Sequence, residues 1–495
     1  MFGWIKNIFE NIKTLNVRVD EYKSDSIIQS LPVVAYVNKA KGLIENKEFD
    51  RAELVLRKAL DISEQDSRIY KYLGKIYEQR LSFKDAAEYY RKSSVINPHD
   101  KEIWLRLGMC YLNSNMIEDA IASFEQADKV TPYNTDVYTG WGMALMKQKK
   151  YALARDKFLT ASQISKYNYT AILLSAIMEI KLHDYDSAEE KLKFLAKVAP
   201  NESSTYEYAN LKLLKADYEE AEKYAKKSIE FNRQMLPAYL ILGEVYSIQK
   251  NKDKVENIFN SALENDLESA ILRTEWGKAY IRLFEFEKAN EEFSIALKQN
   301  VEYLSAKIGL ALTGAYKNDF SMLNELKETN GENVYIQEAL GLEKFHSGRI
   351  EDSIETFKKA LRTDPKQTYN YYHLAHAYRC LNDRYKVREN YEKFVRENPD
   401  YLPGFVDYAK WLIEVSDFSD AQRKLRRAEK LDKNNLEVLN LLFFSLYTLV
   451  KTNVCEYNIK EAISVAQHAQ TLGKFDYENE KQELENILKD IQGNN

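Results

Sequence analysis

The chain has 495 residues, of which 45% are hydrophobic and 30% are charged. Its 71 basic and 76 acidic side chains leave a net charge of −5, which excludes a general nucleic-acid binder, because the affinity of that class rests on phosphate neutralisation. With 16 Gly and 8 Pro, the composition also excludes a low-complexity or collagen-like chain.

Residues 1–16 predict a separate amphipathic helix, followed at 17–32 by a polar tether. Three roles remain open for this helix: a cap folded back onto the protein, a helix lying on a membrane surface, or a helix docked into a partner. With two lysines (Lys6 and Lys13) against Glu10, it attracts anionic lipid only weakly. Its apolar arc consists of Phe2, Trp4, Ile5, Ile8, Phe9, Ile12 and Leu15.

From Val33 onward the sequence repeats with a period of about 34 residues. In most repeats an alanine recurs, a small residue precedes it by twelve positions, and a bulky one follows it by four. This pattern predicts two short helices, with the small positions marking a close approach of their backbones and the bulky side chain filling the wedge toward the next pair. One pair cannot bury its faces alone, so the pairs must stack. The first recurring alanines are Ala52, Ala86, Ala120, Ala154 and Ala188.

Residues 100–134 resemble a tetratricopeptide repeat (TPR), and about thirteen such repeats begin between residues 33 and 436. The resemblance implies an all-α fold, a right-handed superhelical solenoid of helix-turn-helix repeats. It rests on Trp104, Leu107, Gly108, Tyr111, Ala120, Phe124, Ala127 and Pro132.

The predicted organisation has four parts, and the ninth repeat interrupts it. That repeat is short, so its second helix is expected at 320–327, with a kink at 320–333 between two groups of repeats. The apolar stretch 438–450 is too short to span a bilayer and predicts a buried helix. The parts are the N-terminal helix and tether (1–32), repeats 1–9 (33–333), repeats 10–13 (334–474) and a C-terminal capping helix (475–495).

The resemblance also implies that the first helix of each repeat lines a concave, ligand-binding face. At the corresponding positions repeats 2 and 3 are basic, with Glu78 as the only opposing charge. This basic cradle is suited to an acidic segment or a terminal carboxylate; the alternative is a set of ordinary solvated charges. The cradle consists of Arg68, Lys71, Lys75 and Arg106.

In repeats 4–6 the same positions become apolar, which predicts the principal peptide-binding strip. Apolar residues occupy the same positions again in repeats 9 and 10, as Ile308, Leu312, Leu342 and Phe345. The alternative is that neighbouring repeats cover these side chains. The predicted strip comprises Met143, Met146, Leu173, Ile177, Ile180 and Leu211.

Repeat 11 adds a polar and aromatic strip. His373, His376 and Cys380 share one helix face, where Asp407 could complete a zinc site, but a strip on a single helix is more typical of peptide contact. We therefore expect no metal. The strip consists of Tyr369, Tyr372, His373, His376, Arg379 and Cys380.

No motif of nucleophilic catalysis or phosphate binding is present, which predicts no enzyme and no cofactor. We expect a scaffold or adaptor that binds protein or peptide partners, and not nucleic acid, through its concave surface. The alternative is a membrane-tethered assembly or regulatory factor anchored by residues 1–16. Cys110, Cys380 and Cys455 are far apart and no secretion leader is visible, so the expected location is the cytoplasm, with peripheral membrane attachment as the alternative.

Overall fold

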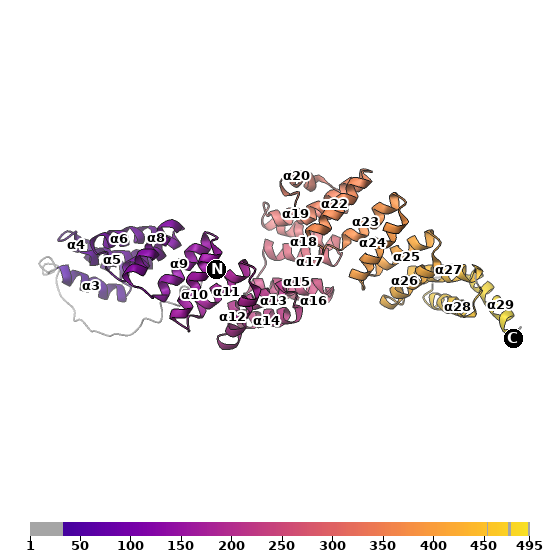
Figure 1. Ribbon diagram of the computed structural model, residues 1–495, viewed down its shortest axis with the longest axis horizontal. Helices are drawn as coiled ribbons and strands as arrows, with labels where there is room; N and C mark the ends of the chain where they lie inside the picture. Colours follow the sequence, from indigo (N-terminus) through magenta and orange to yellow (C-terminus); the bar gives the residue numbers. More distant parts are fainter. Residues whose placement is uncertain (1–32, 453, 474–476, 494–495) are drawn as a thin grey trace. The chain divides into compact units, whose positions relative to one another are not determined.

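The computed structural model describes residues 33–452, 454–473 and 477–493, and all regular structure in these ranges is helical. The 27 helices form thirteen consecutive pairs and one final helix (Figure 1). Each pair coincides with one predicted repeat, so the all-α helix-pair fold is confirmed. The right-handed superhelix stays a prediction.

Each repeat contributes a helix A and a helix B. The A helices are α3 (Val33–Glu45), α5 (Ser67–Gln79), α7 (Ile103–Asn113), α9 (Thr135–Lys147), α11 (Tyr169–Lys181), α13 (Glu202–Leu214), α15 (Leu236–Ile248), α17 (Ala270–Arg282), α19 (Leu304–Ala315), α21 (Val334–His346), α23 (Tyr369–Cys380), α25 (Leu402–Glu414) and α27 (Leu436–Thr452). The B helices are α4 (Phe49–Leu60), α6 (Phe83–Ile96), α8 (Ile117–Val130), α10 (Tyr151–Ile164), α12 (Tyr185–Val198), α14 (Tyr218–Phe231), α16 (Lys252–Glu264), α18 (Phe286–Gln299), α20 (Ser321–Asn330), α22 (Ile350–Thr363), α24 (Arg384–Glu397), α26 (Phe418–Leu431) and α28 (Glu456–Thr471), and α29 (Glu478–Gly493) follows them.

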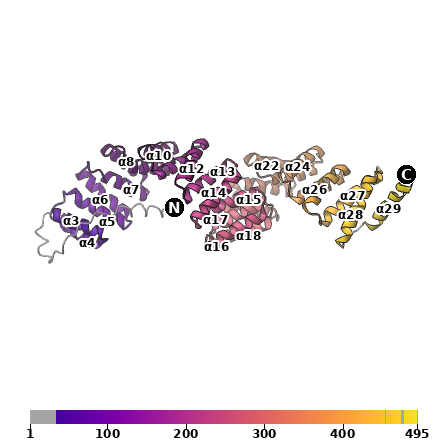
Figure 2. The same cartoon turned by 90° about the horizontal axis from the view of Figure 1, so that it is seen from below.

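The chain divides into two compact units inside α13, the first ending at Leu211 and the second beginning at Lys212. Within each unit, a B helix packs against its own A helix and against the next one, as α8 does between α7 and α9 and α18 between α17 and α19. Figure 2 shows two of these pairs, α7 with α8 and α17 with α18. The kink expected at 320–333 stays a prediction.

The core of a repeat is an aromatic ring of helix B that occupies the space of a missing side chain. A Cβ built on Gly108 would lie 2.7 Å from the Phe124 ring, and one on Gly140 of the next repeat would also lie 2.7 Å from it. Phe124 itself is fully buried. The interpretation that two backbones meet at the small positions is therefore wrong in detail, because the ring stands between them.

The turn from helix A to helix B uses left-handed backbone in almost every repeat. In repeat 3, Asn115 has φ 62°, its N–H donates to Leu112 O, and the next N–H, of Met116, donates to Tyr111 O at 2.9 Å. This is the Schellman arrangement, which satisfies the last carbonyls of helix A and normally favours glycine. Among the helix A–helix B turns of the described residues, glycine takes this position in repeat 10 alone, as Gly348.

Two regions differ in detail from the expected boundaries. Helix α20 of repeat 9 is 10 residues long and ends at Asn330, three residues beyond the predicted end. At the C-terminal side α29 packs against α28 and buries Leu484, in the place expected for a capping helix. None of the helices in the described ranges is long and apolar enough to cross a membrane.

Candidate protein-binding surfaces

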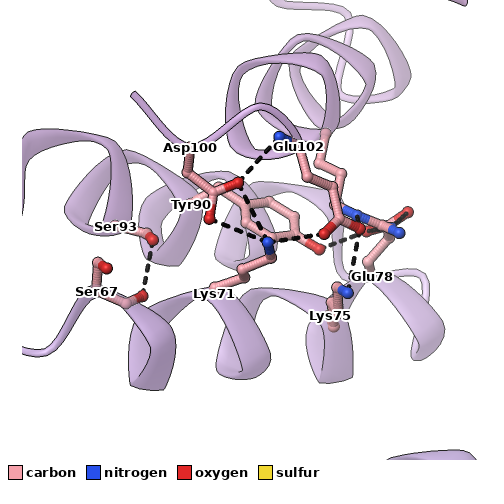
Figure 3. Close-up of polar contacts among 9 residues, drawn as sticks. Ser67, Lys71, Lys75, Glu78, Tyr90, Ser93, Asp100 and Glu102 are labelled. Atoms are coloured by element: carbon pink, nitrogen blue, oxygen red, sulfur yellow. Dashed lines mark hydrogen bonds and ion pairs between the residues drawn. The ribbon is translucent and has the colours of Figure 1, made fainter. Parts of the chain in front are cut away.

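The basic cradle of repeats 2 and 3 is filled by acidic side chains. Lys71 Nζ lies 3.0 Å from Asp100 Oδ2 and 2.8 Å from Glu102 Oε2, and Lys75 Nζ lies 3.1 Å from Glu102 Oε1. Figure 3 shows both lysines, from α5, pointing at the two acids that precede and begin α7. The expectation that Glu78 is the only opposing charge is therefore wrong.

The network continues to Glu78, near the end of α5. Arg106 bridges Glu102 at 2.5 Å and Glu78 at 3.0 Å, and the Tyr90 hydroxyl donates to Glu78 at 2.6 Å. Burial would raise the pKa of Glu102, but Arg106 and the two lysines hold it at about 2. Burial and the neighbouring Arg106 lower the pKa of Lys75. These charges join two repeats to each other and are neither free for an anion nor simply solvated.

Arg68, the fourth residue of the predicted cradle, stands apart from this network. Its side chain is 49% exposed and forms an ion pair at 2.6 Å with Asp66, the N-cap residue of α5. Its guanidinium thus pairs with the side chain that caps its own helix instead of joining the shared network.

The apolar strip predicted in repeats 4–6 is only partly exposed. Leu211 is fully buried and Ile180 is 8% exposed, so neither offers a contact surface. The other four, Met143, Met146, Leu173 and Ile177, are half-buried. Three of these four pack on the buried cluster around Phe158. We call these four the α9–α11 strip.

In repeats 9 and 10 the apolar positions belong to the core. Ile308, Leu312 and Leu342 are buried, and only Phe345 is half-buried. The expectation of a second apolar groove is wrong here, because neighbouring helices cover the side chains that the family pattern places on the concave face.

The aromatic strip of repeat 11 contacts a turn that lies three repeats earlier. The ring centroid of Phe284, in the turn between α17 and α18, is 4.8 Å from that of Tyr369 and 4.7 Å from that of Tyr401. At the start of α18, Phe286 stacks on Tyr316 at 3.8 Å. We call this set the aromatic contact. It joins non-neighbouring repeats of the second compact unit.

A buried carboxylate lies beside the aromatic contact. Glu338 is 1% exposed; it accepts a hydrogen bond from the Tyr316 hydroxyl and one from Asn370 Nδ2 at 3.0 Å. His373 Nε2 lies 3.0 Å from the same hydroxyl and 3.7 Å from Glu338. Burial and the Glu338 charge raise the pKa of Tyr316 well above its usual value. The Glu338 carboxylate is thus paired inside the protein, whereas the buried Asn370 Oδ1 has no hydrogen-bond partner among the described residues.

The remaining predicted residues of repeat 11 are engaged too. The Tyr372 hydroxyl donates to Asp407 at 2.6 Å, and His376 Nε2 lies 3.3 Å from the Tyr391 hydroxyl. Burial, followed by the neighbouring His373, lowers the pKa of His376 to about 4. Tyr372 and His376 are half-buried and already have partners within the protein, and the peptide-contact strip predicted here stays a prediction.

At the end of α23, Arg379 and Cys380 are exposed, and Arg379 pairs with Glu414 at 2.6 Å. Within the described ranges no three His, Cys, Asp or Glu side chains are grouped so as to hold a metal ion. The helix predicted at 1–16 lies outside the described residues, so its role stays a prediction.

Consecutive helix pairs, in which a buried aromatic ring of helix B fills the space beside a glycine of helix A, define a helical-repeat protein. The family described as the tetratricopeptide repeat protein 21 C-terminal ARM domain matches residues 33–139. A solved structure, the APC/C hetero-tetramer Cut9–Hcn1, has a TM-score of 0.51 at 12% identity, covering 94% of this chain and 98% of that one. The 34-residue signature and the observed helix pairs agree with these matches, and the fold is of the tetratricopeptide repeat type.

Two curated relatives share 24% identity with the chain. One is the human protein O-mannosyl-transferase TMTC3, matched over 56% of this chain and 31% of its own length. The other is anaphase-promoting complex subunit 3 of Schizosaccharomyces pombe, matched over 54% of this chain and 42% of its own length. The chain spans less than half of either relative, so neither activity is carried over.

Proposed function

We propose that this protein is a non-enzymatic TPR scaffold that binds a protein or peptide partner through the α9–α11 strip. The observation that carries the proposal is the partial burial of four apolar side chains on two A helices, Met143, Met146, Leu173 and Ile177. A partner that covers them would complete their removal from water, which is favourable by about 25 cal/mol per Å². Methionine suits such a site, because its flexible side chain adapts to different surfaces.

The comparisons support a scaffold of this kind. The similar solved structure is described as a hetero-tetramer of two named proteins, and the matched yeast relative is a subunit of a complex. The net charge of −5 supports protein partners over nucleic acid. The cytoplasmic location stays a prediction, as does the alternative of a membrane-tethered factor.

A peptide selection tests the proposed strip. Peptides are selected from a random library against the full chain and then measured against the double variant Met146→Ser, Ile177→Ser. We expect at least a tenfold loss of affinity, because two apolar anchors of an interface contribute about 1 kcal/mol or more each. The control is Leu153→Ser, which alters a 53% exposed leucine on α10. Equal binding to the double variant and the control, with unchanged melting temperatures, would refute the proposal.

A further inference from the structure

A pocket of about 350 Å³ opens among α22, α23 and α24 in the second compact unit. Helix α23 contributes Tyr371, Leu374 and Tyr378 to its lining. The two flanking B helices contribute cations on both sides. The charged lining residues are Lys358 and Arg362 of α22 and Lys386, Glu389 and Lys393 of α24.

The cations converge on the tyrosine rings. Lys358 Nζ lies 6.0 Å and Lys386 Nζ 4.9 Å from the centroid of the buried Tyr378 ring, so two helices direct like charges to one place. Lys393 Nζ lies 5.7 Å from the centroid of Tyr371. Arg362 is exposed and has no hydrogen bond or ion pair with any residue that the structure describes. Positive charge is thus concentrated around an aromatic surface.

The acids near these cations all belong to the same helix as the cation they pair with. Glu355 pairs with Lys358 at 2.8 Å, Asp383 with Lys386 at 3.7 Å and Glu389 with Lys393 at 2.7 Å. Such partly exposed pairs along a helix contribute little, so an incoming anion can replace them at low cost. In the cradle of repeats 2 and 3, by contrast, ion pairs also join different helices: Lys71 and Lys75 of α5 pair with Glu102, and Arg106 of α7 pairs with Glu78.

We propose that this pocket, which we call the α22–α24 pocket, binds an anionic side chain of an extended acidic peptide. Four cations face three acids, which leaves a net charge of +1, and Glu355 interacts with both Lys358 and Arg362. The volume is at the lower end of the range of about 300–1,000 Å³ for ligand sites, so it admits one or two side chains and not a folded domain. The guanidinium can bind a carboxylate or a phosphate in a bidentate manner, and the tyrosine rings cover the neighbouring apolar atoms of the peptide.

This site goes beyond the proposed function, because it lies on other helices and recognises charge instead of apolar surface. The two proposals therefore fail separately: substitutions in the α9–α11 strip leave the α22–α24 pocket intact, and the reverse also holds.

Fluorescence anisotropy with three labelled peptides tests the proposal on the full chain. The first probe carries glutamates around a central tyrosine, the second has glutamines in their place, and the third is the glutamine peptide with a phosphotyrosine. The pocket variant is Arg362→Gln, Lys386→Gln. Its matched control is Lys359→Gln, Arg384→Gln, which removes one charge from each of the same two helices at exposed positions outside the pocket.

We expect saturable binding of the glutamate or the phosphotyrosine probe, about tenfold weaker in the pocket variant and within twofold of wild type in the control. The affinity should also fall as salt rises. Tighter binding of one anionic probe identifies carboxylate or phosphate as the preferred group. Equal binding of the glutamine probe, or an equal loss in both variants, would overturn the proposal.

Discussion

Two regions of this protein join repeats in different ways. In the first compact unit Glu102 accepts ion pairs from Lys71, Lys75 and Arg106, so the contact links adjacent repeats. In the second, Phe284 contacts Tyr369 across three repeats. Contacts between neighbours are what a stacked array requires, whereas a contact between distant repeats adds a constraint that the repeat pattern does not contain. The same helix-pair unit therefore allows a charged contact between repeats (the charged joint around Glu102) in one region and an aromatic contact between repeats in the other.

The largest expected effect concerns what the two regions share. Gly108→Leu in the first unit and Gly341→Leu in the second should each lower the free energy of unfolding by about 2–3 kcal/mol, because the new side chain overlaps the buried ring of Phe124 or Phe357. Gly42→Leu is the matched control, since a Cβ there meets no atom within 4 Å. Urea unfolding measures all three variants. A Gly108→Leu protein as stable as the control would contradict the conclusion that the Phe124 ring fills the space beside Gly108.

The next effect separates the regions. Phe284→Ala should remove about 2 kcal/mol from the second compact unit, because it deletes a half-buried ring between Tyr369 and Tyr401. Hydrogen exchange should report faster amide exchange in α17–α18 and in α23–α24 together. Phe231→Ala, at a 51% exposed phenylalanine of α14, is the control. Unchanged protection of α23 would show that the aromatic contact does not couple these repeats.

The charged joint should respond to pH. The pKa of Glu102 is about 2 in the folded protein against an ordinary value of 4.5, so its contribution to stability is complete above about pH 4.5 and is lost as the pH falls toward 2. Because the side chain is 36% exposed, solvent screening limits this contribution to about 1–2 kcal/mol.

Glu102→Gln should therefore lower the free energy of unfolding at pH 7 by that amount. It should also reduce the loss of stability (the acid limb) that wild type shows as the pH falls below about 4.5. Glu88→Gln, at an exposed glutamate on α6, should leave both unchanged. Denaturant titrations between pH 2 and pH 7 measure this, and an acid limb that persists in Glu102→Gln would assign it to other carboxylates.

The smallest expected effect compares the turns of the two regions. Lys149 and Lys250 both have left-handed backbone, with φ 60° and 57°. Lys149→Gly should stabilise by about 0.5–1 kcal/mol, because glycine relieves the Cβ strain. Lys250 also donates to Arg282 O and lies 4.1 Å from the Phe284 ring centroid, so Lys250→Gly should gain nothing. Thermal melting checks both, and an equal gain would mean that the Lys250 contacts add no stability.

Much of the fold can be predicted from the sequence, because its determinants recur at short range. Gly108 and Phe124 lie in one repeat, and their spacing repeats along the chain. The surfaces could not be predicted in the same way. The family pattern says that Lys71 and Tyr369 lie on a particular helix face, but not which groups stand opposite. Glu102 begins the next helix and Phe284 lies in a turn, positions that a map of groove-facing residues leaves out.

Burial was the other unpredictable quantity. Ile180 and Met146 occupy equivalent positions in the repeat pattern, eight residues before Ala188 and Ala154, yet Ile180 is buried and Met146 is half-buried. Local spacing determines the direction of a side chain from its helix, whereas its exposure depends on how closely successive repeats stack.

The aromatic contact also changes how the protein should respond to mechanical force. An array held only by neighbouring contacts can be pulled apart one repeat at a time. In the second compact unit, however, the contact between the Phe284 and Tyr369 rings joins repeat 8 to repeat 11, and the hydrogen bond between His373 and the Tyr316 hydroxyl joins repeat 11 to repeat 9 across 57 positions in the chain. When the ends of this segment are pulled, these contacts carry the force first. Repeats 9 and 10 bear no force until the contacts break, and the two repeats then extend together. The second compact unit thus contains a mechanical clamp, whose release would appear as a single long step instead of a series of short ones.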